Sequence, residues 1–127
     1  GAALLNALDI VGKRIEDVRV VFSGAGAAAI ATAEHYVRLG VRRDRIAMCD
    51  REGLVYEGRG HMDPYKERFA QPDTGARALG DVIAGADVFV GLSVAGAMTG
   101  EMVAAMAERP IIFALANPVP EILPDEV

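Results

Sequence analysis

Residues 21–36 read VFSGAGAAAIATAEHY and place two glycines and a run of alanines between a short apolar stretch and a helix-like sequence. Gly24, Gly26 and Ala29 match the pattern G-x-G-x-x-G/A in the context that it requires, after a strand and at the start of a helix. The glycines allow a tight turn and let the backbone approach a pyrophosphate, whose charge the amides of the first helical turn stabilise. The segment therefore predicts a dinucleotide site, and a tight turn that binds nothing is the alternative.

Outward from this segment, apolar patterns predict strands that alternate with helices. The predicted strands are residues 18–23, 45–50, 87–93 and 111–117. The predicted helices lie in residues 2–12, 27–40, 63–70, 75–86 and 100–110. Residues 54–60 fit either a small hairpin arm or a loop. Because such alternation implies parallel crossovers, we expect residues 1–127 to form one Rossmann-like, doubly wound α/β domain, with a mainly parallel sheet and helices on both faces.

Polar and small residues gather where the predicted strands end, which is where ligands bind in such sheets. Asp50 ends the second strand, about 20 residues beyond the glycine turn, and is placed to accept a hydrogen bond from an adenosine ribose. Arg51 follows it and is able to hold a 2′-phosphate, so both NAD and NADP stay open. An ordinary loop aspartate is the alternative for Asp50.

Two further strand ends carry weaker signals. Residues 91–99 read GLSVAGAMT, and their small side chains let the backbone approach the nicotinamide half of a cofactor, although glycines also make ordinary loops. Asn117 precedes Pro118 at the end of the last strand, where its amide can both donate and accept hydrogen bonds. A turn-forming Asn-Pro pair is the alternative.

Composition limits the class of protein. The chain has 127 residues, 52% of them hydrophobic, and a net charge of −5, which suits one globular domain and argues against binding of nucleic acid. The most apolar window is shorter than the roughly 20 residues of a membrane span, so no membrane association is expected. Cys49 is the only cysteine, which fits a cytoplasmic protein without disulfides. On a buried strand, it is expected to be a small core residue.

Six segments in order, spanning nearly the whole chain, read AALLNAL, FSGAGAAAIA, YVRLGVRRDRIAMCD, RGHMDPYKERFA, ADVFVGLSVAGAMTGEMV and RPIIFALANPVPEI. Together they resemble the NAD(P)-binding domain of malic enzymes of the bacterial type. The resemblance implies oxidative decarboxylation of malate to pyruvate and CO2, with NAD or NADP as hydride acceptor and Mg2+ or Mn2+ as Lewis acid.

The resemblance also implies roles for single residues. The pyrophosphate would lie against Gly24, Ala25, Gly26, Ala27 and Ala28. Asp50, followed by Arg51, would meet the adenosine ribose. The nicotinamide side would be lined by Ser93, Val94 and Ala95, and Asn117 would contact cofactor or substrate.

In malic enzymes, the metal-binding carboxylates, a catalytic tyrosine and a lysine base precede the matching segment, and a further substrate-binding asparagine follows it. The resemblance therefore implies that residues 1–127 are part of a longer enzyme, hold no catalytic residue and no metal ligand, and are inactive alone. It also implies apolar surface where the rest of the enzyme packs. Because malic enzymes are usually oligomeric, the whole enzyme is expected to be a homo-oligomer.

Other candidate residues have simpler interpretations. Lys13 precedes the first strand, at the end away from the expected site, and is expected to be a solvated surface lysine. Tyr56, Tyr65 and Lys66 are expected to pack or to face solvent. His35 and His61 have no partner at metal-ligand spacing in the sequence.

Three alternatives remain open from the sequence. One is the cofactor domain of another dehydrogenase, such as an amino-acid dehydrogenase. Another is a non-catalytic Rossmann module that senses a nucleotide or mediates assembly. A methyltransferase that uses adenosylmethionine is a third, because its glycine loop is similar.

Overall fold

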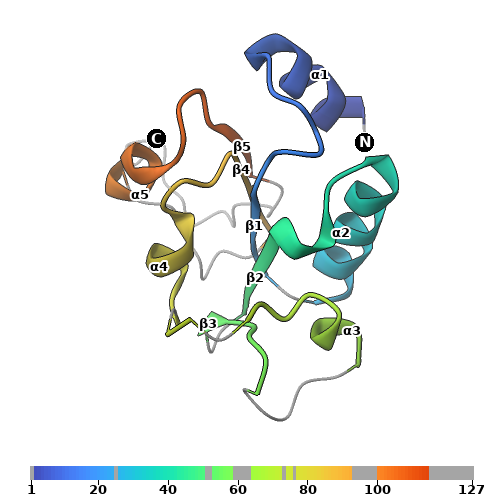
Figure 1. Cartoon of the computed structure of the whole chain (residues 1–127), viewed down its shortest axis with the longest axis vertical. Coiled ribbons are helices and arrows are strands. Elements are labelled where there is room, and N and C mark those ends of the chain that lie inside the picture. Colours follow the sequence, from blue (N-terminus) through green and yellow to red (C-terminus); the bar gives the residue numbers. More distant parts are fainter. Residues whose placement is uncertain are drawn as a thin grey trace, which may run out of the picture.

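The computed structural model places five strands in one sheet, in the order β3-β2-β1-β4-β5 (Figure 1). It describes residues 2–24, 26–50, 53–58, 64–72, 74–75, 77–92 and 100–114. The strands are β1 (Val20–Ser23), β2 (Ile46–Asp50), β3 (Gly53–Leu54), β4 (Val88–Gly91) and β5 (Ile111–Ala114). The helices are α1 (Ala2–Val11), α2 (Ala27–Leu39), the 3-10 turn η1 (Arg43–Arg45), α3 (Pro64–Glu67), α4 (Leu79–Ile83) and α5 (Gly100–Ala105).

The sheet is mainly parallel, as the alternation of elements predicts. β1 pairs in parallel with both β2 and β4, and β4 pairs in parallel with β5. The register aligns four small residues in one row near the carboxyl ends of these strands: Cys49, Ser23, Gly91 and Ala114. Ser23 and Cys49 in this row are buried.

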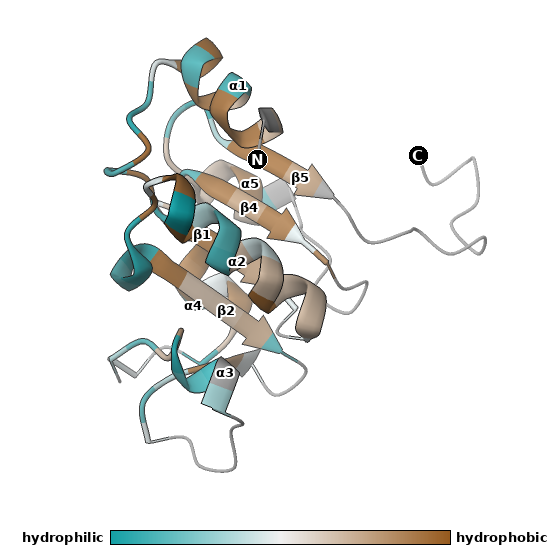
Figure 2. Cartoon of the chain, turned by 90° about the vertical axis from the view of Figure 1, so that its right-hand side faces the viewer, coloured by the Kyte–Doolittle hydropathy of each residue, from teal (hydrophilic) through white to brown (hydrophobic). Residues whose placement is uncertain are grey.

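Helices cover both faces of the sheet, with α1 and α2 on one side and α4 and α5 on the other (Figure 1). Side chains alternate along each strand, so Val20 and Phe22 join the core under α1 and α2, whereas Val21 joins the core under α4. The strands are therefore apolar along most of their length, as Figure 2 shows for β2, β4 and β5, although β2 ends in the hydrophilic Asp50. The predicted α/β class with a doubly wound sheet is confirmed.

The structure shortens three predicted helices, and α3 ends at Glu67 rather than at residue 70. α4 begins only at Leu79, and α5 ends at Ala105, because the Ala107 amide donates to the Ala86 carbonyl instead of continuing the helix. Residues 53–54 pair antiparallel with β2, so a hairpin arm includes only the first residue of 54–60, and residues 59–60 lie outside the described residues. The predicted ends of the third and fourth strands, at residues 93 and 115–117, lie outside the described residues.

Among the helices that the structure describes, none is both long and apolar enough to span a membrane.

Candidate functional site

The chain reverses direction across the sheet at β1. It first builds β2 and β3 on one side of β1 and then returns to build β4 and β5 on the other. In an open α/β sheet, such a switch point leaves a crevice outside the carboxyl ends of the strands, and ligands bind there. The glycine turn follows β1 directly, so it lies at this position.

The glycine turn brings two predicted site residues together. Gly24 has a φ of 125°, a conformation that L side chains rarely adopt, and its amide donates to the Cys49 carbonyl at 2.6 Å. This bond joins the first residue after β1 to the end of β2, immediately before Asp50. The structure thus places Gly24 and Asp50 at neighbouring points of the same edge.

Gly26 is the N-cap residue of α2, and the helix start suits an anion. No side chain caps the first turn of α2, and no acidic residue lies in it. A Cβ added to Gly26 would meet nothing within 4 Å, and Ala27 and Ala28 beside it are exposed. Amide groups at a helix start that no side chain caps are able to bind a phosphate group. Ala29, the third residue of the pattern, is buried against the sheet, which accounts for its small size.

Asp50 is partly buried and forms an ion pair that the sequence does not predict. The Lys66 Nζ lies 3.0 Å from the Asp50 Oδ2, with 24% and 14% of the two side chains exposed. Lys66 belongs to the short helix α3, whose start the Asp-Pro pair at residues 63–64 indicates. Lys66 is partly buried, which agrees with the expectation that it packs or faces solvent, but its ion pair with Asp50 is an addition that the sequence analysis lacks. No local pattern links two residues that are 16 positions apart.

Several predicted site residues lie outside the described residues: Ala25, Arg51, Ser93, Val94, Ala95 and Asn117. His61 lies outside them too, and of Tyr65 only the backbone, within α3, is described. Where side chains are described, no group of three or more His, Cys, Asp or Glu residues is arranged to hold a metal ion.

Lys13 differs from its prediction. It is not a solvated lysine: its Nζ lies 2.8 Å from the Asp87 Oδ1, and only 13% of the side chain is exposed. The pair joins the segments before β1 and β4, so the predicted position of Lys13, at the edge away from the site, is confirmed. Cys49 is buried in the core under α4, as predicted.

Comparison with known proteins identifies the family. Residues 1–125 match the family described as malic enzyme, NAD binding domain. The chain is 55% identical over 126 residues to an NADP-dependent malic enzyme of Haemophilus influenzae, covering 98% of this chain and 17% of that protein. It is 53% identical over 125 residues to an NAD-dependent malic enzyme of Rhizobium meliloti, covering 98% of this chain and 16% of that protein.

A solved structure agrees with the sequence comparisons. The crystal structure of the NAD-dependent malic enzyme from Thermotoga maritima superimposes with a TM-score of 0.82 and 37% identity, covering 98% of this chain and 34% of that one. The chain thus spans about a third of this structure and about a sixth of the two curated relatives. Residues 1–125, which match the family, include the glycine turn, β2 with Asp50, and the whole described sheet. This chain belongs to the family of malic enzyme NAD-binding domains.

Proposed function

We propose that residues 1–127 bind NAD or NADP across the carboxyl edge of the sheet and form the cofactor domain of a malic enzyme. The observation that carries the proposal is the meeting of three features at the switch point: the Gly24 turn, the uncapped start of α2 and the Asp50 carboxylate. The turn and the helix start suit the pyrophosphate of a dinucleotide, and the carboxylate suits its adenosine ribose. The family to which the chain belongs supports the same assignment.

The proposal gives each part of the edge a separate role. The backbone of residues 24–28 would receive the pyrophosphate, because glycine and alanine leave its amides accessible. Asp50 would accept a hydrogen bond from the adenosine ribose, since a carboxylate can accept several at once. Ser93, Val94 and Ala95 would line the nicotinamide side, and Asn117 would contact cofactor or substrate. When bound, the nicotinamide ring supplies the hydride acceptor.

Lys66 bears on the choice between the two cofactors. Its ammonium group lies 3.0 Å from the carboxylate that would hold the ribose, so under the proposal it would lie close to the ribose 2′ position. A 2′-phosphate would gain a cation there, whereas a 2′-hydroxyl needs only the Asp50 oxygens. Lys66 together with Arg51 therefore favours NADP, and Asp50 favours NAD.

The activity of the whole polypeptide is part of the proposal. We propose that it oxidises malate and releases CO2 to give pyruvate, with Mg2+ or Mn2+ held by residues outside this chain. We also propose that the whole enzyme is a cytoplasmic homo-oligomer.

Calorimetric titration with NAD and, separately, NADP tests the cofactor assignment on the wild type and on Asp50→Ala, Arg51→Ala and Lys66→Ala. Loss of a charge-assisted hydrogen bond is worth about 1.5–3 kcal/mol, or roughly a tenfold to hundredfold loss of affinity. Lys66→Ala should weaken NADP by that amount and leave NAD within about twofold. Asp50→Ala should weaken NAD. A folded chain that binds neither cofactor, inside the whole polypeptide as well as alone, would contradict the proposal.

Two alternative functions make different predictions from a malic enzyme. An amino-acid dehydrogenase domain is disfavoured by the family match. A non-catalytic nucleotide sensor predicts cofactor binding by the whole polypeptide without malate-dependent reduction of NAD or NADP. Measuring that reduction by absorbance decides between the sensor and the enzyme.

A further inference from the structure

A short segment, residues 66–71, joins the proposed ribose site to the core of the domain. At one end, the Lys66 Nζ lies 3.0 Å from the Asp50 Oδ2. Three residues on, Phe69 is only 1% exposed and belongs to the core under α1 and α2. The Phe69 amide donates to the Lys66 carbonyl at 2.9 Å, so one turn of backbone carries both residues. The position of Phe69 in the core therefore fixes the backbone from which Lys66 extends.

The helix that contains Lys66 is too short to hold its own position. α3 has four residues, Pro64–Glu67, and isolated helices shorter than about 12 residues are marginal in water. Contacts with the rest of the domain must therefore hold this segment. Phe69 supplies such a contact, because burial of its ring removes a large apolar surface from water.

The Arg43 guanidinium covers the Phe69 ring. Its carbon atom Cζ lies 4.9 Å from the ring centroid, within the distance at which a cation is attracted to the face of an aromatic ring. Arg43 belongs to η1, directly before β2. The Phe69 ring therefore contacts the core and also a charged residue of another element.

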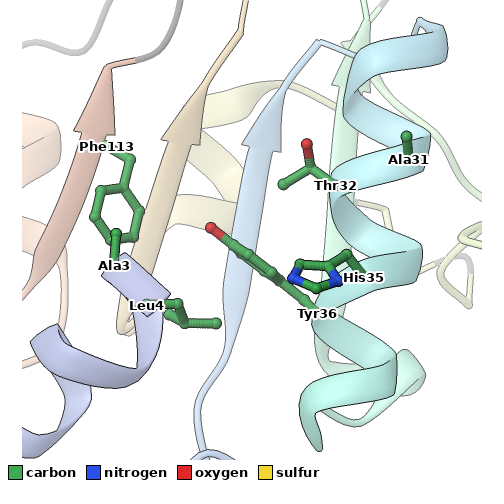
Figure 3. Close-up of a pocket in the computed structure, with 7 residues that line it drawn as sticks. All are labelled: Ala3, Leu4, Ala31, Thr32, His35, Tyr36 and Phe113. Atoms are coloured by element: carbon green, nitrogen blue, oxygen red, sulfur yellow. The ribbon is translucent and has the colours of Figure 1, made fainter. Parts of the chain in front are cut away.

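Glu34 on α2 holds this arginine in place. The Glu34 Oε1 accepts hydrogen bonds from the Arg43 Nη1 at 3.3 Å and from the Arg68 Nη1 at 3.5 Å. The hydrogen bond from Arg43 is the main reason that the pKa of Glu34 lies below its usual value, so the carboxylate is charged at neutral pH. The next residues of α2, His35 and Tyr36, line a cavity beside α1 instead (Figure 3). Glu34 therefore connects α2 both to η1 and to the residue that follows α3.

We infer that Phe69, with the Arg43 guanidinium over its ring, is a positioning residue for Lys66. As a core residue, Phe69 does not reach the cofactor itself. It fixes the backbone turn from which Lys66 reaches the ribose 2′ position, and so it contributes to the binding of NADP. The inference rests on the proposed function, because it requires NADP to lie along this edge with its 2′-phosphate beside Lys66.

Titration of the full-length polypeptide with NADP and, separately, NAD tests this role in Phe69→Leu and Arg43→Ala. Both variants should bind NADP roughly threefold to tenfold more weakly, because the long Lys66 side chain then has to be ordered when the cofactor binds. The affinity for NAD should stay within about twofold, because a 2′-hydroxyl needs no cation. Unchanged NADP affinity in Arg43→Ala, or equal weakening of both cofactors, would overturn the inference.

Arg42→Ala is the matched control. Arg42 is the neighbour of Arg43, but its exposed guanidinium pairs with the Asp44 carboxylate. The control should bind both cofactors as the wild type does. An equal loss of NADP affinity in Arg42→Ala would show that loss of positive charge, and not the position of Phe69, weakens binding. That result would also overturn the inference.

A double-mutant cycle shows whether Phe69 acts through Lys66. In a Lys66→Ala background, Phe69→Leu and Arg43→Ala should cause no further loss of NADP affinity, because the side chain that they position is gone. Losses that add to that of Lys66→Ala would contradict the positioning role. Phe69→Leu also removes core volume and should lower the urea midpoint, whereas Arg43→Ala changes a side chain that is 41% exposed. The Arg43→Ala result therefore decides the question if Phe69→Leu does not fold.

The same titrations keep the inference apart from the proposed function. A wild type that binds NADP, together with variants that bind it equally well, overturns only the positioning role. A wild type that binds NAD but not NADP overturns the inference and is consistent with a cofactor domain. A wild type that binds neither cofactor contradicts the proposed function and, with it, the inference that rests on it.

Discussion

At the scale of single residues, Gly26 and Gly53 differ in the space that the structure leaves for a side chain. Gly26 has a φ of −79°, which any residue adopts, and open space around its Cβ position. Gly53 has a φ of +107°, and a Cβ there would overlap the carbonyl oxygen of Arg77. The fold therefore requires a glycine at position 53, whereas at position 26 the described residues would accept a side chain, and the proposed pyrophosphate is the reason we expect a glycine there.

We predict that Gly26→Val abolishes cofactor binding and leaves the fold intact. A Cβ at this position would meet nothing within 4 Å, and we expect the branched valine side chain to obstruct the approach of a pyrophosphate to the α2 amides. Calorimetry with NAD and NADP, together with a urea unfolding curve, measures both effects. Retained cofactor affinity in the folded variant would mean that the turn holds no pyrophosphate.

Gly53→Ala should instead destabilise the domain by about 1–3 kcal/mol, from the left-handed backbone conformation and the overlap with Arg77. The urea midpoint should fall accordingly. Gly58→Ala is a suitable control, because it shares the positive φ but has nothing within 4 Å of its Cβ position. A smaller loss at position 58 would isolate the contribution of the overlap.

At the scale of elements, side chains hold segment ends in place. The Asp81 carboxylate accepts hydrogen bonds from the amides of Arg77 and Ala78, both at 3.0 Å, and so caps the start of α4. These two bonds hold the pKa of Asp81 below its usual value. A carboxyl group whose pKa is lower in the folded state stabilises the fold above its unfolded pKa, and the stabilisation is lost as the pH falls through the folded value.

Asp81→Ala should therefore lower the free energy of unfolding at pH 7 and have a smaller effect below about pH 4, where the carboxyl group becomes protonated. Urea unfolding of the wild type and the variant at several pH values measures the difference. A difference that stays constant down to pH 2 would show that the charge of Asp81 plays no part in the cap.

The connections before β1 and β4 are joined by one carboxylate. Asp87 accepts from the Lys13 ammonium at 2.8 Å and from the Arg19 amide at 2.9 Å. Asp87→Ala should cost about 1–3 kcal/mol, because it leaves a partly buried amide and ammonium group without their acceptor. Asp44→Ala, which breaks the exposed pair with Arg42, should cost less than about 1 kcal/mol. Equal losses in urea unfolding would contradict this ranking.

At the scale of the whole molecule, we expect residues 1–127 to bind the cofactor without catalysing the reaction. The described sheet contains the switch point at β1, but where side chains are described there is no metal cluster. We predict that residues 1–127 bind cofactor and show no malate-dependent reduction of NAD or NADP at any Mg2+ or Mn2+ concentration. Absorbance of the reduced nicotinamide measures this, with the full-length polypeptide as the positive control. Turnover by residues 1–127 alone would place the catalytic groups inside this chain.

The sequence by itself determined the fold class, the position of the glycine turn and the place of Asp50 at a strand end. These features are local: a strand buried on both faces is a continuous apolar run, and a tight turn beside a phosphate requires glycine. Only the tertiary structure placed Lys66 against Asp50, Lys13 against Asp87, the Arg77 carbonyl against Gly53 and Tyr36 in its cavity. Such pairings depend on the order of the strands and on how the connecting segments cross them, and no periodic pattern of side chains encodes either.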